Sequence, residues 1–344
     1  MSLNLVKYTT SKQSFQILAN TLASHDGACY NVGMSNNNDN IHRINKSIPD
    51  VDPNYVPWGH FRAIQSVLQS GLFTPTLVTG LSGNGKTTMI EQVCAKMGRE
   101  LYRVNITTDT DEDDLFGGFR LVNGETVWQD GPVIQAMERG SVLLLDEFDL
   151  GSPKIMCLQP VLEGKGVFLK KANRMVRPAP GFCIFLTANT KGKGSDDGRF
   201  IGTNVQSEAF LDRISFCFEQ DYAPKATEKK ILMTMCNNLE FVGKAGQRVC
   251  DEKFMDNLVT WGAATREGFE KGANDEVIST RRLVDICKAY AIFGCKETAI
   301  KLSLSRFDTD TGEALFNLYT KFDDSFSKKE TNTENKENNN EQMG

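Results

Sequence analysis

Four short apolar runs, each followed by a polar residue, mark the first part of the chain. They cover residues 76–79, 101–104, 142–145 and 183–186. Runs of this length are typical of strands that are buried on both faces, as in a parallel sheet. A helical pattern over residues 89–97 follows the first run. The alternation of buried strands with helices predicts an α/β fold with a parallel sheet.

Beyond residue 222 the pattern changes to the longer spacing of amphipathic helices. The helical segments cover residues 225–239, 251–270, 280–293 and 311–322. Consecutive helices without intervening strands are typical of a separate helical unit. The pattern therefore predicts a small all-α lid domain after the α/β domain.

These patterns divide the chain into four parts. We expect a helical N-terminal segment at residues 1–45, an α/β domain at 46–222, a helical lid at 223–326 and a polar tail at 327–344. The tail contains Met343 as its single large apolar residue. Because it buries too little apolar surface to offset its ordering entropy, we expect it to be disordered.

Composition narrows the class of protein. A formal charge of −5 over 344 residues gives no strong nucleic-acid signal, because general nucleic-acid binders carry a basic excess. No apolar run approaches the roughly 20 residues that cross a bilayer, and the N-terminus lacks a secretion signal. The nine cysteines stand singly, which is typical of free thiols in a reducing compartment, and the three histidines lack zinc-ligand spacing. We therefore expect a cytoplasmic protein without membrane spans.

The first apolar run leads into a glycine-rich motif of the form G-x-x-x-x-G-K-[ST]. Its residues are Gly80, Leu81, Ser82, Gly83, Asn84, Gly85, Lys86, Thr87 and Thr88. The glycines let successive backbone N–H groups point inward, where they and the next helix N-terminus cradle phosphate oxygens. Lys86 can reach the β- and γ-phosphates, and the Thr87 hydroxyl can ligate Mg²⁺. The motif in a strand–loop–helix frame predicts an ATP site.

Two carboxylates follow the run at residues 142–145. Asp146 is expected to hold Mg²⁺, and Glu147 to orient and polarise the attacking water, because γ-phosphate hydrolysis needs a positioned nucleophile. The alternative is that these residues cap a helix, as acidic residues after strands often do. Pairing with the phosphate-binding motif favours the catalytic interpretation.

Polar residues also end the other two runs, and two arginines come later. Asn189 follows residues 183–186 and is placed to lie between the water and the γ-phosphate, and Asn105 could restrain Glu147. Asparagine is also common in turns, so this alternative stays open. Arg213 and Arg281 are candidates to stabilise the transferring phosphoryl group, Arg213 from a neighbouring subunit. The alternative for either arginine is a surface salt bridge.

Two hairpins are predicted inside the α/β domain. The first lies within residues 115–131 and turns at Asn123-Gly124, which is a strong hairpin signal. The second lies within residues 166–177 and turns at residues 172–173.

In this order, the motifs resemble those of AAA+ ATPases, and more narrowly the CobS subunit of cobaltochelatase within the MoxR and dynein-related branch. The resemblance covers roughly residues 46–290. Its selective stretches are Ile48-Pro-Asp-Val-Asp-Pro-Asn-Tyr55, Arg103-Val-Asn105, Asp114-Leu-Phe-Gly117, Asp130-Gly131, Asp146-Glu-Phe-Asp149, Arg177-Pro178, Thr187-Ala-Asn-Thr190 and Gly202-Thr203.

The resemblance implies a three-layer αβα P-loop domain with a parallel sheet, followed by a small all-α lid. By position, Lys86 and Thr87 resemble Walker A, Asp146 and Glu147 Walker B, Asn189 sensor 1, Arg213 the arginine finger and Arg281 sensor 2. The implied cofactors are ATP and Mg²⁺. The two hairpins resemble the helix-2 and pre-sensor-1 inserts, which face a ring pore or a partner; the alternative is that they cover the domain core.

The resemblance also implies that the subunits assemble into a ring, a hexamer, and that this ring remodels a protein partner. One candidate partner is an adaptor with a metal-ion adhesion domain. Two alternatives remain open at this point. One is the ATPase motor subunit of a cobalt- or magnesium-chelatase-type complex, and the other is a slow, nucleotide-gated assembly factor. Intact Lys86, Asp146 and Glu147 argue against a pure binding module.

Overall fold

A computed structural model describes residues 48–192, 194, 202–237 and 251–326. The predicted N-terminal segment at residues 1–45 and the predicted tail at residues 327–344 lie outside these ranges.

A five-stranded parallel sheet forms the centre of the first domain, in the order β2-β5-β8-β1-β9. Its strands are β1 (Thr76–Thr79), β2 (Leu101–Asn105), β5 (Val142–Asp146), β8 (Cys183–Ala188) and β9 (Phe216–Glu219). The first four confirm the predicted strands. The edge strand β9 was not predicted, because its apolar run has only three residues and the strand is largely exposed.

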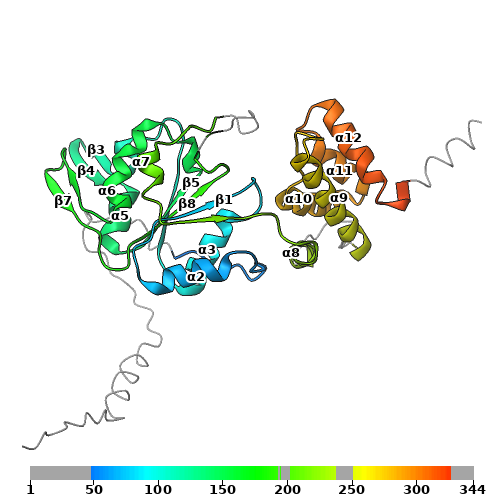
Figure 1. Ribbon diagram of the computed structural model, residues 1–344, viewed down its shortest axis with the longest axis horizontal. Coiled ribbons are helices and arrows are strands. Elements are labelled where there is room, and N and C mark those ends of the chain that lie inside the picture. The colour runs from blue at the N-terminus through cyan, green and yellow to red at the C-terminus, as the bar shows by residue number, and fades with distance from the viewer. Residues whose placement is uncertain (1–47, 193, 195–201, 238–250, 327–344) are drawn as a thin grey trace, which may run out of the picture. The chain divides into compact units, whose positions relative to one another are not determined.

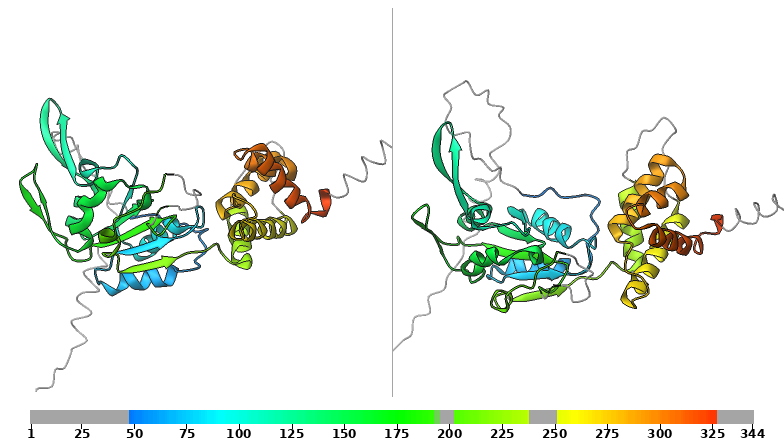
Figure 2. Two further views of the ribbon diagram at one scale, coloured as in Figure 1. Left: turned by 45° about the horizontal axis from the view of Figure 1, so that its top comes forward. Right: turned by 90° about the horizontal axis from the view of Figure 1, so that it is seen from above.

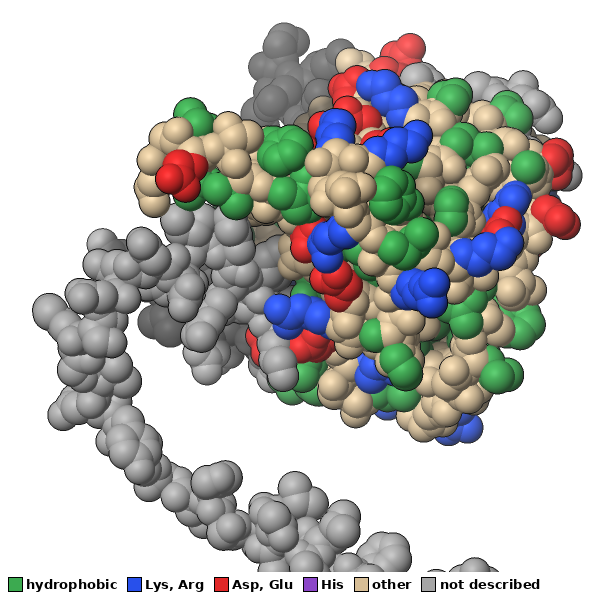
Figure 3. Space-filling view, turned by 90° about the vertical axis from the view of Figure 1, so that its left-hand side faces the viewer, with side chains coloured by type: hydrophobic (Ala, Val, Ile, Leu, Met, Phe, Trp, Pro, Cys, Tyr) green, Lys and Arg blue, Asp and Glu red, His purple; other side chains and the backbone are tan. Residues whose placement is uncertain are grey.

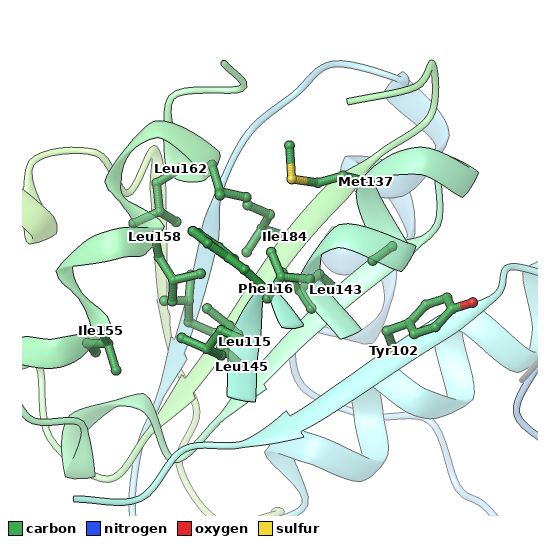
Figure 4. Close-up of a cluster of buried hydrophobic side chains, with 14 of the residues drawn as sticks. Tyr102, Leu115, Phe116, Met137, Leu143, Leu145, Ile155, Leu158, Leu162 and Ile184 are labelled. Carbon is green, nitrogen blue, oxygen red and sulfur yellow. The ribbon is translucent and has the colours of Figure 1, made fainter. Parts of the chain in front are cut away.

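Side chains alternate between the two faces of this sheet. In β5, Leu143 and Leu145 join one hydrophobic cluster, whereas Val142 and Leu144 join another. Helices α2 (Phe61–Ser70) and α3 (Lys86–Met97) pack on the second cluster, and α5 (Pro132–Arg139) packs on the first, which Figure 4 shows. Because both faces are covered, the domain has three layers, as the α/β prediction requires (Figure 1).

Short elements connect these layers. They are α4 (Glu112–Leu115), the 3₁₀ helices η1 (Phe148–Leu150) and η2 (Pro153–Leu158), α6 (Gln159–Leu162) and α7 (Glu208–Leu211). The start of α4 is fixed by a capping box, in which the Asp111 carboxylate accepts from the backbone of residue Asp114 and the Asp114 carboxylate from that of Asp111.

Both predicted hairpins are present. Strands β3 (Gly117–Val122) and β4 (Glu125–Asp130) pair antiparallel, and the turn residues Asn123 and Gly124 have φ of 52° and 86°. Such left-handed conformations are what a two-residue hairpin turn requires.

The second hairpin differs from its prediction. Strands β6 (Val167–Leu169) and β7 (Arg174–Val176) are shorter than expected, and the turn spans residues 170–173 instead of 172–173. Lys171 pairs with Asp113 and Arg174 with Asp130, and both ion pairs attach this hairpin to the base of the first one.

Hydrophobic side chains remain exposed on both hairpins. They are Phe119, Leu121, Val127, Phe168 and Met175. Figure 3 views the molecule from the side of the hairpins, where hydrophobic and basic side chains lie next to one another.

Helices form the rest of the described chain, as predicted. They are α8 (Lys225–Asn237), α9 (Glu252–Glu270), α10 (Thr280–Phe293), α11 (Lys296–Leu304) and α12 (Thr309–Thr320), which Figure 2 shows packed together. Their core contains Trp261 and Tyr319, whose rings meet edge to face with centroids 5.4 Å apart. Helix α11 was not predicted. Within the described ranges, no helix is both long enough and apolar enough to pass through a membrane.

Candidate functional site

The glycine-rich motif forms the loop between β1 and α3. At Gly80 the backbone has φ of 138°, and a Cβ there would lie 2.1 Å from the carbonyl oxygen of Gln220. Only glycine fits this approach. Helix α3 begins at Lys86, earlier than the predicted residue 89, so its N-terminus and the free N–H groups of its first turn lie at the loop.

Lys86 lies beneath this loop with 8% of its surface exposed. Its Nζ donates to the carbonyl oxygens of Gly80 and Leu81, at 2.6 and 3.0 Å, and to Oδ1 of Asn189 at 3.2 Å. The structure thus joins the predicted lysine to the predicted asparagine, which comes from the end of β8.

Burial lowers the pKa of Lys86 to about 8. The negative charges of Asp149, Asp146 and Glu147 oppose this shift, and the positive charge of Arg281 adds to it. A bound phosphate would favour the charged form of Lys86 and so offset the cost of its burial.

Asp146 is 3% exposed at the end of β5. Its Oδ1 accepts a hydrogen bond of 2.8 Å from the Thr87 hydroxyl, and another from the Thr187 hydroxyl. Its Oδ2 pairs with Nη2 of Arg103 at 2.5 Å. The two predicted Mg²⁺ ligands, Thr87 and Asp146, are therefore in direct contact, although they are separated by 59 residues in the sequence.

Glu147 follows Asp146 in a left-handed conformation, with φ of 56°. Its backbone N–H donates to the Thr187 hydroxyl at 3.1 Å, and its carboxylate makes no capping hydrogen bond to η1. The helix-cap alternative is thus not supported for this residue. Asn105 Oδ1 accepts from Arg103 at 3.5 Å, so the structure pairs Asn105 with Arg103 and not with Glu147.

A cavity of about 240 Å³ brings most of the predicted residues together. It is lined by Ser82, Gly83, Asn84, Gly85, Lys86, Thr87, Thr88, Asp146, Glu147, Asn189 and Arg281. Gly80 and Leu81 take part through their carbonyl groups on Lys86.

Arg281 reaches the cavity from the first turn of α10. Two contacts hold this region near the loop: the Tyr222 hydroxyl donates to the Ser82 carbonyl at 2.7 Å, and Ser279 lies against Gly83. A Cβ on Gly83 would lie 2.7 Å from the Ser279 side chain, so the approach depends on glycine.

Arg213 lies elsewhere. It follows α7, and its Nη2 and Nε bind Oε1 of Glu163 at 2.6 and 2.7 Å. It does not line the cavity that contains Lys86. Within one subunit, the structure therefore places Arg213 in a partly exposed ion pair, which is the alternative that the sequence left open.

Two residues of the site were not assigned a role from the sequence. Arg103 bridges Asp146 and Glu91, at 2.5 and 3.0 Å. Asp149 is fully buried and accepts hydrogen bonds from the turn that contains Asn189. Both lie in stretches that resemble the AAA+ pattern, and that position was the one signal available for them.

The donor set fits Mg²⁺ and a nucleotide triphosphate. Thr87 and Asp146 offer hydroxyl and carboxylate oxygens, the ligand types that Mg²⁺ prefers. The loop supplies backbone N–H groups at a helix N-terminus, and Lys86 and Arg281 supply positive charge at the same cavity.

Comparison with known proteins agrees with this geometry. The AAA domain family of the dynein-related subfamily matches residues 75–214. The chain is 31% identical over 255 residues to the aerobic cobaltochelatase subunit CobS of a Sinorhizobium species, which covers 72% of this chain and 74% of CobS.

Two further relatives match shorter stretches. Midasin of Giardia intestinalis is 31% identical over 165 residues, 46% of this chain but 3% of midasin. Protein NorQ of Paracoccus denitrificans is 31% identical over 139 residues, 40% of this chain and 51% of NorQ. The matched domain and the extent of the likeness to CobS show that this chain belongs to the MoxR/dynein-related branch of the AAA+ ATPase family.

Proposed function

We propose that this protein binds ATP with Mg²⁺ and hydrolyses it, and that it uses this cycle in a ring of subunits to remodel a protein partner. The contact between Thr87 and Asp146 at 2.8 Å carries the proposal, because it sets a hydroxyl and a carboxylate side by side next to the phosphate loop. Membership of an ATPase family supports the same activity.

Each residue has a role in this proposal. The loop N–H groups and Lys86 bind the phosphates, and Thr87 with Asp146 holds Mg²⁺, which neutralises phosphate charge when bound. Glu147, at the tip of β5 beside them, orients the attacking water as general base. Asn189 and Arg281 contact the γ-phosphate, since both line the same cavity as Lys86.

The position of Arg213 supports a ring. An arginine finger must reach the transferring phosphoryl group, and Arg213 lies outside the cavity of its own subunit. A neighbouring subunit would supply it in a ring, for which we propose a hexamer. The exposed hydrophobic side chains of the two hairpins suit contact with a protein partner.

A pair of variants tests the activity. Glu147→Gln should bind ATP normally but hydrolyse it more slowly by roughly 10²-fold or more, because the water loses its orienting carboxylate. Lys86→Ala should weaken ATP binding itself. Nucleotide affinity by fluorescence titration and phosphate release are the measurements, with the exposed Glu313→Gln as a matched control. If Glu147→Gln hydrolyses ATP as fast as the parent, Glu147 is not the general base.

The likeness to CobS favours a second candidate, the ATPase motor subunit of a cobalt- or magnesium-chelatase-type complex. In that case ATP turnover should rise when a tetrapyrrole-binding subunit and an adaptor with a metal-ion adhesion domain are added. A turnover that stays slow with every partner would favour a nucleotide-gated assembly factor instead.

A further inference from the structure

Asp149 is a fully buried carboxylate three positions beyond Asp146, at 0% exposure. Its Oδ2 accepts three hydrogen bonds from one turn: from the backbone N–H of Asn189 at 3.0 Å, and from the N–H and the hydroxyl of Thr190, both at 2.9 Å. A carboxylate that accepts three bonds from two consecutive residues fixes the backbone of that turn.

The turn held in this way carries the Asn189 side chain. Asn189 Oδ1 lies 3.2 Å from Lys86 Nζ and lines the cavity that holds the phosphate loop. A shift of the backbone at residues 189–190 would therefore move the amide away from the lysine. The second oxygen of Asp149, Oδ1, is buried without a hydrogen-bond partner among the described residues.

That unpaired oxygen argues against a role in stability alone. Burying a carboxylate with one oxygen unpaired is costly, so stability alone does not explain an aspartate at this position. Nearby residues extend the same connection: the Asp149 carbonyl accepts from the N–H of Asn204 at 2.7 Å, and the Gln206 N–H donates to Gly192 at 2.8 Å.

We infer that Asp149 is a positioning residue of the γ-phosphate site, which sets the Asn189 amide opposite Lys86 and so lets the protein distinguish a triphosphate from a diphosphate. The inference rests on the proposed function, in which this cavity holds ATP. Asp149 does not line the cavity, and its Oδ2 is bound to the turn, so it acts through Asn189 and not on the nucleotide directly.

The test measures the affinities for ATPγS and ADP, with Mg²⁺, in the full-length protein. Asp149→Ala should weaken ATPγS binding by about tenfold, the effect of one misplaced hydrogen bond to a charged group, and leave the ADP affinity within about threefold. Phosphate release should slow by at least about tenfold. Asp149→Asn, whose amide oxygen can still accept from the turn, should retain most of the discrimination.

Asp323 provides a matched control, because it is another buried, hydrogen-bonded aspartate and lies at the end of the helical region. Asp323→Ala should lower the melting temperature without changing the ratio of the two affinities. An unchanged ratio in folded Asp149→Ala, an equal change in Asp323→Ala, or Asp149→Asn as defective as Asp149→Ala would each overturn the inference.

Two further measurements keep the outcome decisive. If Asp149→Ala does not fold, Thr190→Val removes one of the three bonds and should reduce the discrimination by about two- to fivefold. An unchanged ratio there would also overturn the inference. The two affinities can be measured without hydrolysis. A parent protein that binds ATPγS but never releases phosphate from ATP would contradict the proposed function. The ratio of the ATPγS and ADP affinities would still decide whether Asp149 positions Asn189.

Discussion

A buried ion pair in the helical region is connected to the phosphate loop through Tyr222. Arg266 and Glu228 form an ion pair in which Nη1 and Nη2 bind the two carboxylate oxygens at 3.0 and 2.7 Å. The guanidinium also donates to the Ile278 carbonyl at 2.9 Å and stacks 3.9 Å above the ring of Tyr222. Tyr222 in turn binds the phosphate loop, so this pair supports the side of the cavity that faces the helices.

We predict that Glu228→Ala lowers the free energy of unfolding of the helical region by about 3–5 kcal/mol, because it leaves a buried guanidinium without its carboxylate. Unfolding in urea is the measurement, followed by the fluorescence of Trp261 with Trp58 and Trp128 replaced by Phe in parent and variants alike. The exposed pair of Lys301 and Glu297 supplies the control, and Glu297→Ala should cost less than about 0.5 kcal/mol. Equal losses in the two variants would contradict the prediction.

Residues of the site differ in how far sequence reveals them. Lys86, Thr87 and Asp146 follow from local motifs, since phosphate and metal chemistry restricts the residue types at fixed spacing. Arg103 and Asp149 act through contacts with residues about 40 positions away, Asp146 and Asn189, and no local pattern encodes such contacts. The partner that the sequence suggested for Asn105 was Glu147, whereas the structure gives Arg103.

Whether a helix or strand can be predicted from the hydrophobic pattern depends on how much of it is buried. Strands β1, β5 and β8 lie inside the sheet and are buried along their whole length, and β2, at one edge, begins with two buried residues. Strand β9 lies at the other edge with Phe216 45% exposed, and its three apolar residues are too few to stand out as a buried strand. Helix α11 has only nine residues, which are too few for the helical spacing of its apolar residues to stand out in the sequence.

The end of α12 offers a prediction about pH. Burial raises the pKa of Asp323, but hydrogen bonds from Ser325 and Tyr319 and the charge of Lys296 outweigh burial and lower it from 3.8 to about 2. The folded state therefore holds this carboxylate ionised more strongly than the unfolded state does. Its contribution to stability is present above about pH 4 and is lost as the pH falls through about 2.

Asp323→Asn should consequently be less stable than the parent at neutral pH, and the difference should narrow between about pH 4 and pH 2. Thermal unfolding of both proteins across this range is the measurement. The exposed Asp310→Asn in the first turn of α12 is the control and should show a much smaller difference than Asp323→Asn across this range. A constant gap between parent and Asp323→Asn would refute the electrostatic explanation.

For the whole molecule, the proposed ring makes the place of Arg213 testable. Arg213→Ala should lose most of its turnover, on the order of 10³-fold, while each subunit still binds ATP. Mixing Arg213→Ala subunits with Lys86→Ala subunits should restore part of the activity, because a mixed interface can pair an intact Lys86 with an intact Arg213. Phosphate release from the mixture is the measurement.

Light scattering of the mixture checks that subunits exchange. With exchange established, no recovery would mean that Arg213 acts within its own subunit or that the ring requires every site. Normal turnover in Arg213→Ala alone would show that Arg213 is not an arginine finger and that its role is limited to the ion pair with Glu163.

The contacts of Ser82 and Gly83 connect the phosphate loop to the helical region. The Tyr222 hydroxyl rests on Ser82, and Ser279 rests on Gly83, so the segments that lead into α8 and α10 are coupled to the loop's backbone. A change in the shape of the loop would therefore also move the segments that lead into α8 and α10. A side chain at Gly83 would collide with Ser279 and would therefore disturb the phosphate loop and the start of α10 together.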